Sequence, residues 1–430
     1  MTRGSAGPPP DLERLLSPFG VISDCQQTQG ESWHGDLTAF HSTLGSGVPG
    51  RGAPAGRSAG GAGHTFRSPD TARLIALAEA AERYSTYEPP DTAYTWATVG
   101  ELDGPVLDTD RIPRCSGREL AHPRCPLREF DPQARIRWVR GLDLIAGDGV
   151  WLPWVMSNYG PHAVAEEQFW YRISTGFAVH TDPVEAVVRG ICEIIERDMI
   201  ALTWLQRLEL SSISDTVTTP LIEYVRDAAR RHFVEIRLLD ATSDLGVPTV
   251  YCLLTAPHDP KVNSTVGCST GRNLASAAEK ALSEALWMRS LLHRQTSPPP
   301  GAPGDCVELT DGALFMGSAE FATEFDFLRR GGPAASRAVD LPEEPAAALR
   351  DLLLRLDERD MQVVAAEHTT TELAEVGLTS VSVVIPELMP MSLLSLAQYR
   401  AHPRLYAAPV AMGFAARSEE ELNPWPQPFA

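Results

Sequence analysis

Residues 68–86, SPDTARLIALAEAAERYST, predict a long amphipathic helix. Ser68 is a favoured residue for capping a helix N-terminus, and Pro69 would occupy the first helical position, where proline is tolerated. One apolar stripe comprises Leu74, Leu77, Ala78 and Ala81, and the neighbouring stripe carries Glu79 and Glu82. The helix therefore places two carboxylates at the boundary of an apolar face.

The same layout recurs in residues 182–200, DPVEAVVRGICEIIERDMI. Asp182 and the proline after it signal the start of this helix. Its apolar stripe comprises Val187, Ile191, Ile194 and Ile195. Glu193, Glu196 and Arg197 lie beside that stripe, so the pattern Glu-x-x-Glu-Arg occurs twice in the chain. A third helix, expected over residues 274–293, carries Glu284 beside an alanine-rich stripe.

Strands are expected between these helices. Short apolar runs at residues 250–254 and 381–385 predict two of them, and their alternation with helices indicates a mixed α/β (α+β) class. Residues 45–63, GSGVPGRGAPAGRSAGGAG, lack core-forming side chains and are expected to form a mobile loop. Proline-rich stretches at 297–304 and 331–349 interrupt the chain without clearly dividing it into domains.

The charge balance narrows the choice of partners. The formal net charge is -19, from 37 basic and 56 acidic residues, and this field repels nucleic acid and anionic lipid. The sequence has no apolar signal core and no uninterrupted apolar run of roughly 18 residues, so a cytoplasmic location is expected. Its seven cysteines are scattered without a Cys-x-x-Cys pair, which argues against a disulfide framework or a zinc site.

The paired glutamates have two interpretations. Carboxylates at positions i and i+3 of a helix repel one another by a few tenths of a kcal/mol unless a cation lies between them. Arg83 and Arg197 are one source of compensation, and a solvated helix face is another. Alternatively, magnesium takes oxygen ligands, and two metal ions that share five carboxylates would suit a nucleotide. Glycine-bearing turns at residues 173–176 and 267–271 could present backbone amides to phosphate.

At these residues the chain resembles the YcaO family, whose members use ATP to activate a backbone amide of a peptide. The matching segments, in order, are residues 68–72, 78–85, 174–178, 193–198, 280–285, 377–378, 384–388 and 423–430. The resemblance implies a YcaO-type fold with mixed sheets and helices around an ATP cleft. It also implies two parts: an N-terminal segment, residues 1–57, packed on the core and including the start of the glycine-rich loop, and a catalytic domain, residues 58–430.

Carried over position by position, the resemblance implies a magnesium–ATP site. The implied magnesium ligands are Glu79, Glu82, Glu193, Glu196 and Glu284. Ser68 and Arg197 would contact the phosphates of ATP. Thr175 and Lys280 would join the nucleotide site where the family usually has asparagine and arginine, and lysine keeps the charge without the bidentate fork. Thr65 replaces a common lysine and Trp287 a common glutamine, so the nucleotide contacts are expected to be rearranged there.

The C-terminal sequence NPWPQPFA indicates the subtype. By itself, such a proline run predicts a frayed polyproline end or a ligand for another protein's aromatic groove. Within the family, a terminal Pro-x-Pro-x-Pro resembles the azoline-forming (SagD-like) cyclodehydratases, whose rigid tail helps to order the active site. The residues concerned are Pro424, Pro426 and Pro428, and the terminal carboxylate of Ala430 is a candidate proton acceptor.

The resemblance implies a definite reaction. A Cys, Ser or Thr side chain of a ribosomally made precursor peptide attacks the preceding carbonyl, ATP phosphorylates the resulting oxyanion, and loss of phosphate leaves a thiazoline or (methyl)oxazoline. The implied partners are the precursor peptide, a separate E1-like protein that binds its leader, and a flavin-dependent azoline dehydrogenase. Dimerisation is expected from the resemblance alone.

Two alternatives remain open. A non-catalytic scaffold with this fold could dock the precursor peptide for another enzyme. The intact carboxylates argue against that alternative, and the altered nucleotide-side residues keep it open. A serine hydrolase could use Ser269, because residues 267–271 read Gly-x-Ser-x-Gly. Its acid would be Asp305 or Asp326, and its base would be His368 or His402.

Overall fold

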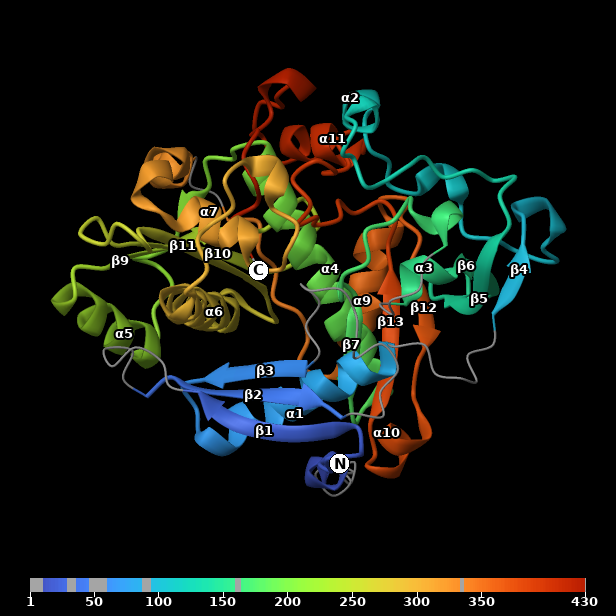
Figure 1. Ribbon diagram of the computed structural model, residues 1–430, viewed down its shortest axis with the longest axis horizontal. Coiled ribbons are helices and arrows are strands. Elements are labelled where there is room, and N and C mark those ends of the chain that lie inside the picture. The colour runs from blue at the N-terminus through green and yellow to red at the C-terminus, as the bar shows by residue number, and fades with distance from the viewer. Residues whose placement is uncertain are drawn as a thin grey trace.

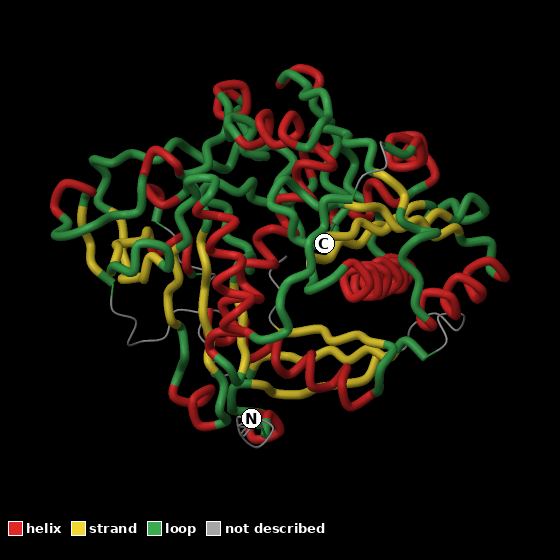
Figure 2. The backbone as a smooth tube through the Cα atoms, turned by 180° about the vertical axis from the view of Figure 1, so that it is seen from behind, coloured by secondary structure: helices red, strands yellow, loops and turns green. Residues whose placement is uncertain are grey.

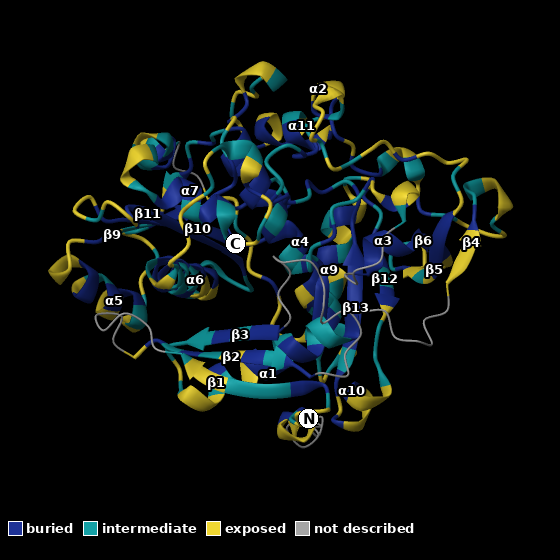
Figure 3. Cartoon of the chain, in the orientation of Figure 1, coloured by how far each residue is buried: buried dark blue, intermediate teal, exposed yellow. Residues whose placement is uncertain are grey.

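The computed structural model describes residues 11–28, 36–45, 60–86, 94–158, 164–332 and 336–429. Three antiparallel sheets surround one long helix, α4 (Pro183–Leu205), which runs through the middle of the molecule (Figure 1). This helix is buried along most of its length, as the dark blue ribbon of Figure 3 shows. The mixed α+β class predicted from the sequence is confirmed.

The first sheet consists of β1 (Ile22–Thr28), β2 (Thr38–Leu44) and β3 (Gly60–Thr65), in that order. Helix α1 (Pro69–Thr86) lies on this sheet and begins where the sequence predicted, because the Ser68 hydroxyl accepts a hydrogen bond from the Thr71 amide at 3.1 Å. The predicted boundary near residue 57 lies between strands that pair with each other, since β2 pairs with β3.

Strand β3 corrects the prediction of a loop over residues 45–63. Residues 46–59 lie outside the described ranges, whereas residues 60–63 form a strand against α1. A Cβ atom on Gly61 would lie 2.5 Å from the Ala76 carbonyl, and one on Gly63 would lie 2.1 Å from the Ala72 carbonyl. The glycines thus allow direct backbone contact between strand and helix.

This close packing widens the buried face of α1 beyond the predicted stripe. Ala72 and Ala76 are fully buried against β3, and Leu77 and Ala81 are buried as predicted, whereas Leu74 of the predicted stripe is 44% exposed. Small side chains on the helix match the glycines of the strand. The face that carries Glu79 is therefore turned inward rather than lying at the edge of a leucine stripe.

The second sheet has the order β11-β10-β9-β8. Its strands are β8 (Ser211–Ser212), β9 (Glu235–Asp240), β10 (Thr249–Thr255) and β11 (Ser264–Thr270). Helices α5 (Pro220–Arg231) and α6 (Leu274–Arg294) cover one face, so the predicted strand at 250–254 and the predicted third helix are both confirmed. In both views α6 lies over the first sheet as well (Figure 1 and Figure 2).

The predicted glycine turn at residues 267–271 is wrong for most of its length. Residues 267–270 belong to β11, and only Gly271 lies beyond the strand. A Cβ atom on Gly267 would lie 2.3 Å from the Ala281 carbonyl of α6. This glycine therefore serves the contact between strand and helix, as Gly61 and Gly63 do on the first sheet.

The third sheet has the order β4-β5-β12-β13-β7, with β6 paired to β5. Its strands are β4 (Thr95–Ala97), β5 (Ile136–Asp143), β6 (Gly149–Pro153), β7 (Phe177–His180), β12 (Val364–Glu367) and β13 (Thr379–Val384). Helix α4 packs on β7 and β13 and also contacts α9 (Pro345–Asp357). The remaining helices are α2 (Gly117–Ala121), α3 (Trp154–Ser157), α7 (Asp311–Gly317), α8 (Asp326–Arg330), α10 (Thr371–Glu375) and α11 (Arg404–Ala411). Within the described residues, no helix is both long and apolar enough to span a membrane.

The protonation of His402 makes the stability of the fold depend on pH. Its Nε2 lies 2.9 Å from the Pro386 carbonyl, and its Nδ1 accepts a hydrogen bond from the Arg404 amide at 3.2 Å, so the neutral imidazole is the form that both bonds require. Burial lowers the pKa of His402 to about 4, whereas an unfolded histidine titrates near about 6.5. The unfolded state therefore binds more protons between these values, and stability falls as the pH falls through this window.

Replacement of His402 by Gln is accordingly expected to flatten the dependence of unfolding free energy on pH between about 4 and 6.5. His402 takes up at most one proton on unfolding, so the slope of unfolding free energy against pH should fall by at most about 1.4 kcal/mol per pH unit. Urea denaturation across that range measures the slope, with His122→Gln at an exposed position as the matched control. An unchanged slope in the His402 variant would contradict the assignment.

Candidate active site

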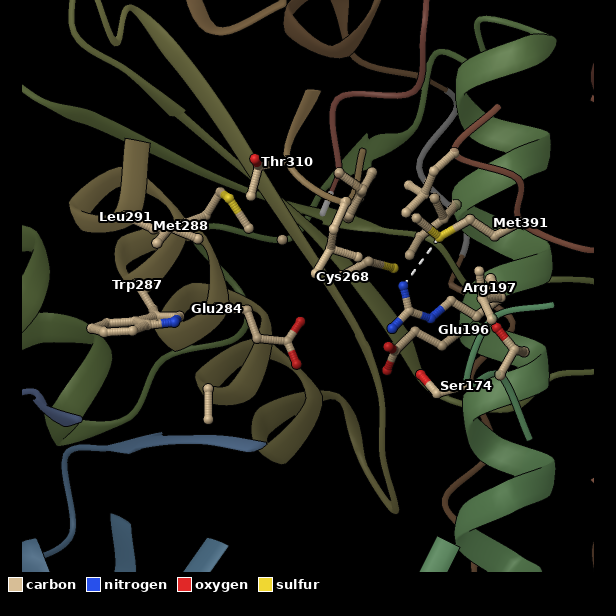
Figure 4. A pocket seen from close by; sticks show the side chains of 18 of the residues that line it. Ser174, Glu196, Arg197, Cys268, Glu284, Trp287, Met288, Leu291, Thr310 and Met391 are labelled. Carbon is tan, nitrogen blue, oxygen red and sulfur yellow. Dashed lines mark hydrogen bonds between the residues drawn. The ribbon is translucent and has the colours of Figure 1, made fainter. Parts of the chain in front are cut away.

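Three helices that are distant in the sequence meet around one cavity of about 480 Å³. Its lining includes Glu79 of α1, Glu196 and Arg197 of α4, and Glu284 of α6. Figure 4 shows the carboxylates of Glu196 and Glu284 directed toward each other across this space. A second cavity of about 490 Å³ shares Glu79 and Glu284 with the first, so these carboxylates stand at the boundary between the two.

On α1, one arginine forms ion pairs with both carboxylates. Arg83 Nη2 lies 2.9 Å from Glu79 Oε1, and Arg83 Nη1 lies 2.6 Å from Glu82 Oε1. The other oxygen of Glu79 accepts a hydrogen bond from the Ala62 amide of β3 at 2.9 Å. The interpretation in which Arg83 compensates the pair is confirmed for this helix.

On α4 and α6 the cations stand further away. Glu193 Oε2 accepts a hydrogen bond from the Gly176 amide at 2.9 Å, and Arg197 Nη2 lies 3.7 Å from its other oxygen. Glu196 Oε2 accepts a hydrogen bond from the Thr270 amide of β11 at 2.9 Å. The ammonium group of Lys280 lies 3.7 Å from that same oxygen and 3.6 Å from Glu284 Oε1.

The carboxylates of the cluster outnumber the cations that pair with them. The five carboxylates pair with Arg83, Arg197 and Lys280, and Arg172 also lines the cavity. Burial raises the pKa of Glu82 to about 8 and that of Glu284 to about 7, and it also raises the pKa of Glu193. Burial opposes the charge of Arg197, but nearby carboxylates, led by Glu193, raise its pKa overall. A divalent cation would relieve this repulsion.

The carboxylate side chains are of the ligand type that magnesium prefers, although they are too far apart to coordinate one ion together. Within the described ranges, no three His, Cys, Asp or Glu side chains are close enough to hold a metal ion as they stand. The donors are nevertheless hard carboxylate oxygens, which magnesium prefers. Backbone amides hold one oxygen each of Glu79, Glu193 and Glu196 and so orient these side chains, as outer-shell groups do at metal sites.

Three buried polar atoms at the cavity have no hydrogen-bond partner among the described residues. They are His64 Nδ1, Thr175 Oγ1 and Arg197 Nε, and all three residues line the 480 Å³ cavity. Arg197 is otherwise held by a contact of 3.1 Å between Nη1 and the Met391 sulfur, drawn as the dashed line in Figure 4. Buried unpaired donors are costly, and an anionic ligand in this cavity would satisfy them.

The remaining predicted nucleotide contacts are distributed unevenly. Ser68 caps α1 through Thr71 and lines neither of the two cavities. Lys280 and Thr65 line the 490 Å³ cavity, where the Lys280 side chain is 60% exposed. Trp287 lines the first cavity and stacks on His64, with ring centroids 5.9 Å apart.

The C-terminal tail is buried rather than frayed, so the structure corrects the interpretation of a loose polyproline end. Pro426, Pro428 and Phe429 are buried, whereas Pro424 is exposed. The Trp204 indole donates a hydrogen bond to the Trp425 carbonyl at 3.0 Å. Ala430 lies outside the described residues.

The tail also reaches the site. Phe429 lines the 480 Å³ cavity and packs edge-on against Tyr251, with ring centroids 5.6 Å apart. The segment runs inward beside α4 and α6 (Figure 1). The three prolines restrict the backbone of the segment that places Phe429 at the cavity.

The hydrolase alternative gains no support. Ser269 lies fully buried within β11 rather than on an exposed turn. His368 Nε2 lies 2.9 Å from Ser382 Oγ, and His402 bonds to Pro386. Asp305 pairs with Arg124, and Asp326 pairs with Arg329. Each candidate acid and base is thus engaged elsewhere.

Several contributors were missed by sequence reasoning. The amides of Ala62 and Thr270 and the sulfur of Met391 touch the functional carboxylates and Arg197, yet no local motif marks them. The residue after Arg197 forms a buried ion pair: Arg404 Nε and Nη2 lie 2.8 Å from the two oxygens of Asp198. The sequence offers Asp198, next to Arg197, as the only hint of it.

The family model described as "YcaO cyclodehydratase, ATP-ad Mg2+-binding" matches residues 62–389. Among curated proteins, an uncharacterized protein in the tfuA 3' region of Rhizobium leguminosarum bv. trifolii is 28% identical over 238 residues, 51% of this chain and 52% of that protein. The chain spans about half the length of the curated relatives it matches.

Solved structures share the fold at low identity. A structure described as "Heterocyclase in complex with substrate and Cofactor" has a TM-score of 0.80 at 19% identity, covering 97% of this chain and 56% of the other. The YcaO protein of Methanopyrus kandleri bound with AMPPCP and Mg2+ has a TM-score of 0.62 at 17% identity, covering 88% of each chain. The E. coli microcin synthetase McbBCD complex with pro-MccB17 bound has a TM-score of 0.63 at 15% identity, covering 94% of this chain and 96% of the other.

The family model spans most of the chain, including α1, α4 and α6 with all five glutamates, and the fold agrees with that of solved heterocyclases. The chain therefore belongs to the YcaO family.

Proposed function

We propose that the protein is an ATP- and magnesium-dependent cyclodehydratase that acts on a ribosomally made peptide. The observation that carries this proposal is the convergence of Glu79, Glu196, Glu284 and Arg197 on one cavity. Glu82 and Glu193 do not line it but pair with Arg83 and Arg197, which do. A divalent cation would relieve the mutual repulsion of these carboxylates. Membership of the YcaO family supports the same chemistry.

The reaction would form one ring and expel one water equivalent as phosphate. The thiol or hydroxyl of a Cys, Ser or Thr attacks the preceding carbonyl carbon and releases its proton, and the carbonyl oxygen becomes phosphorylated as ADP departs. Breakage of the C–O bond then releases phosphate, and loss of the amide proton leaves the C=N bond of a thiazoline or (methyl)oxazoline.

The residues of the chain have distinct proposed roles. Glu79, Glu82, Glu193, Glu196 and Glu284 would hold magnesium, which supplies charge neutralisation at the phosphates when bound. Arg197, which already points into the cavity, would stabilise charge on the transferred phosphoryl group. Ser68, Thr175 and Lys280 are proposed as further nucleotide contacts; the unpaired Thr175 hydroxyl supports that role most directly.

A single assay tests this function. ADP formation is expected to require magnesium, the precursor peptide and its leader-binding protein together, and the peptide is expected to lose 18 Da per ring by mass spectrometry. Peptide binding without any nucleotide binding would instead identify the docking scaffold. That alternative retains some support, because Arg83 already occupies the α1 carboxylates.

The proposed partners follow from the resemblance. They are the precursor peptide, a separate E1-like protein that binds its leader, and a flavin-dependent azoline dehydrogenase. A homodimer and a cytoplasmic location are further proposals, as is the division into segments 1–57 and 58–430. Copurification of the chain with the product of a neighbouring gene for an E1-like protein would test the central partner.

The buried tail leads to a separate prediction. Phe429 is buried and lines the cavity, so we propose that added residues at this end of the chain disturb the packing beside the site. An extension by several residues is therefore expected to cripple turnover while leaving ATP binding intact. The same residues added before Met1 serve as the control, and nucleotide binding is measured by calorimetry. Full turnover in the extended protein would rule out a role for the terminal carboxylate.

A further inference from the structure

The two halves of the carboxylate cluster differ in how closely cations hold them. On α1 both oxygens of Glu79 are engaged, one by Ala62 and one by Arg83, and Arg83 also binds Glu82 at 2.6 Å. Between α4 and α6, the Lys280 ammonium stands 3.6 Å from Glu284 and 3.7 Å from Glu196, beyond the range of a strong charge-assisted bond. The α1 half is therefore held by short ion pairs with Arg83, whereas the α4–α6 half has its cation at a longer distance.

The Arg83 guanidinium competes directly with a metal ion for these carboxylates. A guanidinium that binds two carboxylates at once occupies the same oxygens that a divalent cation would use. The Arg83 side chain is only 12% exposed, so little water screens these two ion pairs. The Lys280 side chain is 60% exposed on a flexible stem, so its ammonium can turn toward solvent without breaking a close hydrogen bond, although Glu196 and Glu284 attract it and raise its pKa.

We propose that Arg83 is an internal cation that holds the α1 half of the site closed, so that divalent ions load in a fixed order. The first ion binds Glu196 and Glu284 between α4 and α6. The second binds Glu79 and Glu82 only after the Arg83 side chain has turned away. Arg83 already lines the 480 Å³ cavity, which offers the displaced guanidinium a place to go. This inference rests on the metal site of the proposed function.

Manganese provides a probe for the loading order, because it takes similar oxygen ligands and its free form is counted by electron paramagnetic resonance. The full-length protein, without nucleotide or peptide, is titrated with Mn²⁺. Two classes of site are expected, one tight and one weak. In Arg83→Met the weak class should tighten by at least about tenfold, because the metal no longer displaces two charge-assisted bonds.

Two further variants separate displacement from simple loss of charge. Arg83→Lys keeps the charge but cannot bridge both carboxylates, so it should also tighten the weak class, although by less than Met does. Arg73→Met removes an arginine from the same helix, where it pairs with Glu13 at 2.7 Å, and should leave both classes unchanged.

The outcomes are distinguishable. If Arg83→Lys binds Mn²⁺ as the unmodified protein does while Arg83→Met binds it more tightly, charge alone is responsible and the ordered displacement is overturned. Unchanged binding in both variants also overturns it and leaves the metal site intact. If Mn²⁺ does not bind the unmodified protein at all, the proposed metal site itself fails.

Discussion

Glu196→Gln is expected to lower magnesium- and peptide-dependent ADP formation by at least about a hundredfold. Its carboxylate is the most buried of the five, with the side chain 6% exposed, and it lies between β11 and α6. The glutamine carbonyl can still accept the hydrogen bond from Thr270, so the change removes charge while preserving the local packing. Activity is measured by coupled detection of ADP.

Thermal unfolding separates this loss from misfolding. Because one of five mutually repelling carboxylates is neutralised, ligand-free Glu196→Gln should be at least as stable as the unmodified protein. Magnesium with a non-hydrolysable ATP analogue should raise the unfolding temperature of the unmodified protein and have little effect on the variant. Glu223→Gln, at an exposed position on α5, is the matched control. Undiminished stabilisation of Glu196→Gln by the ligand would contradict its role as a metal ligand.

Arg404→Met is expected to destabilise the fold by about 3–5 kcal/mol. Arg404 forms two bonds of 2.8 Å to Asp198 and one of 2.9 Å to Asp244, and Asp198 is fully buried. Methionine fills a similar volume but leaves the Asp198 carboxylate buried without its counter-ion. Urea denaturation at neutral pH measures the loss.

The double variant Asp198→Asn/Arg404→Met should recover part of that stability, because the buried charge is then gone. The ion pair between Asp198 and Arg404 also lies close to the candidate active site in the chain. Asp198 follows Arg197 on α4 and accepts a hydrogen bond from the Met389 amide, two residues before the methionine that contacts Arg197. A loss below about 1 kcal/mol in the single variant would show that the charge is solvated or repaired by another group.

Much of the candidate site could be predicted because its signals are local. Capping at Ser68 and Asp182 places the starts of α1 and α4, and the spacing of Glu193 and Glu196 puts both carboxylates on adjoining positions of one helix. Their position at the border of the core, inferred from neighbouring alanines and isoleucines, is confirmed by intermediate or complete burial.

The segments whose structure was predicted wrongly share one feature, which is their glycine content. Glycines in residues 60–63 and at residue 267 were interpreted as loop or turn residues, whereas they lie in strands pressed against α1 and α6. The same absence of a side chain favours flexibility in an isolated chain and close backbone packing in a folded one. Only the presence of the opposing helix distinguishes the two.

The helices that carry the five glutamates, the alternation of helices and strands, and the ordered motifs of the family could all be predicted from the chain alone, because caps and periodicity act over a few residues. Only the folded structure shows which groups meet those carboxylates: Arg83 on the same helix, Lys280 across the cavity, and backbone amides from β3 and β11. It also shows that the proline tail is buried and that Phe429 lies beside the cavity. These contacts join residues far apart in the chain, and they form only when burial of apolar surface brings the three sheets together around α4.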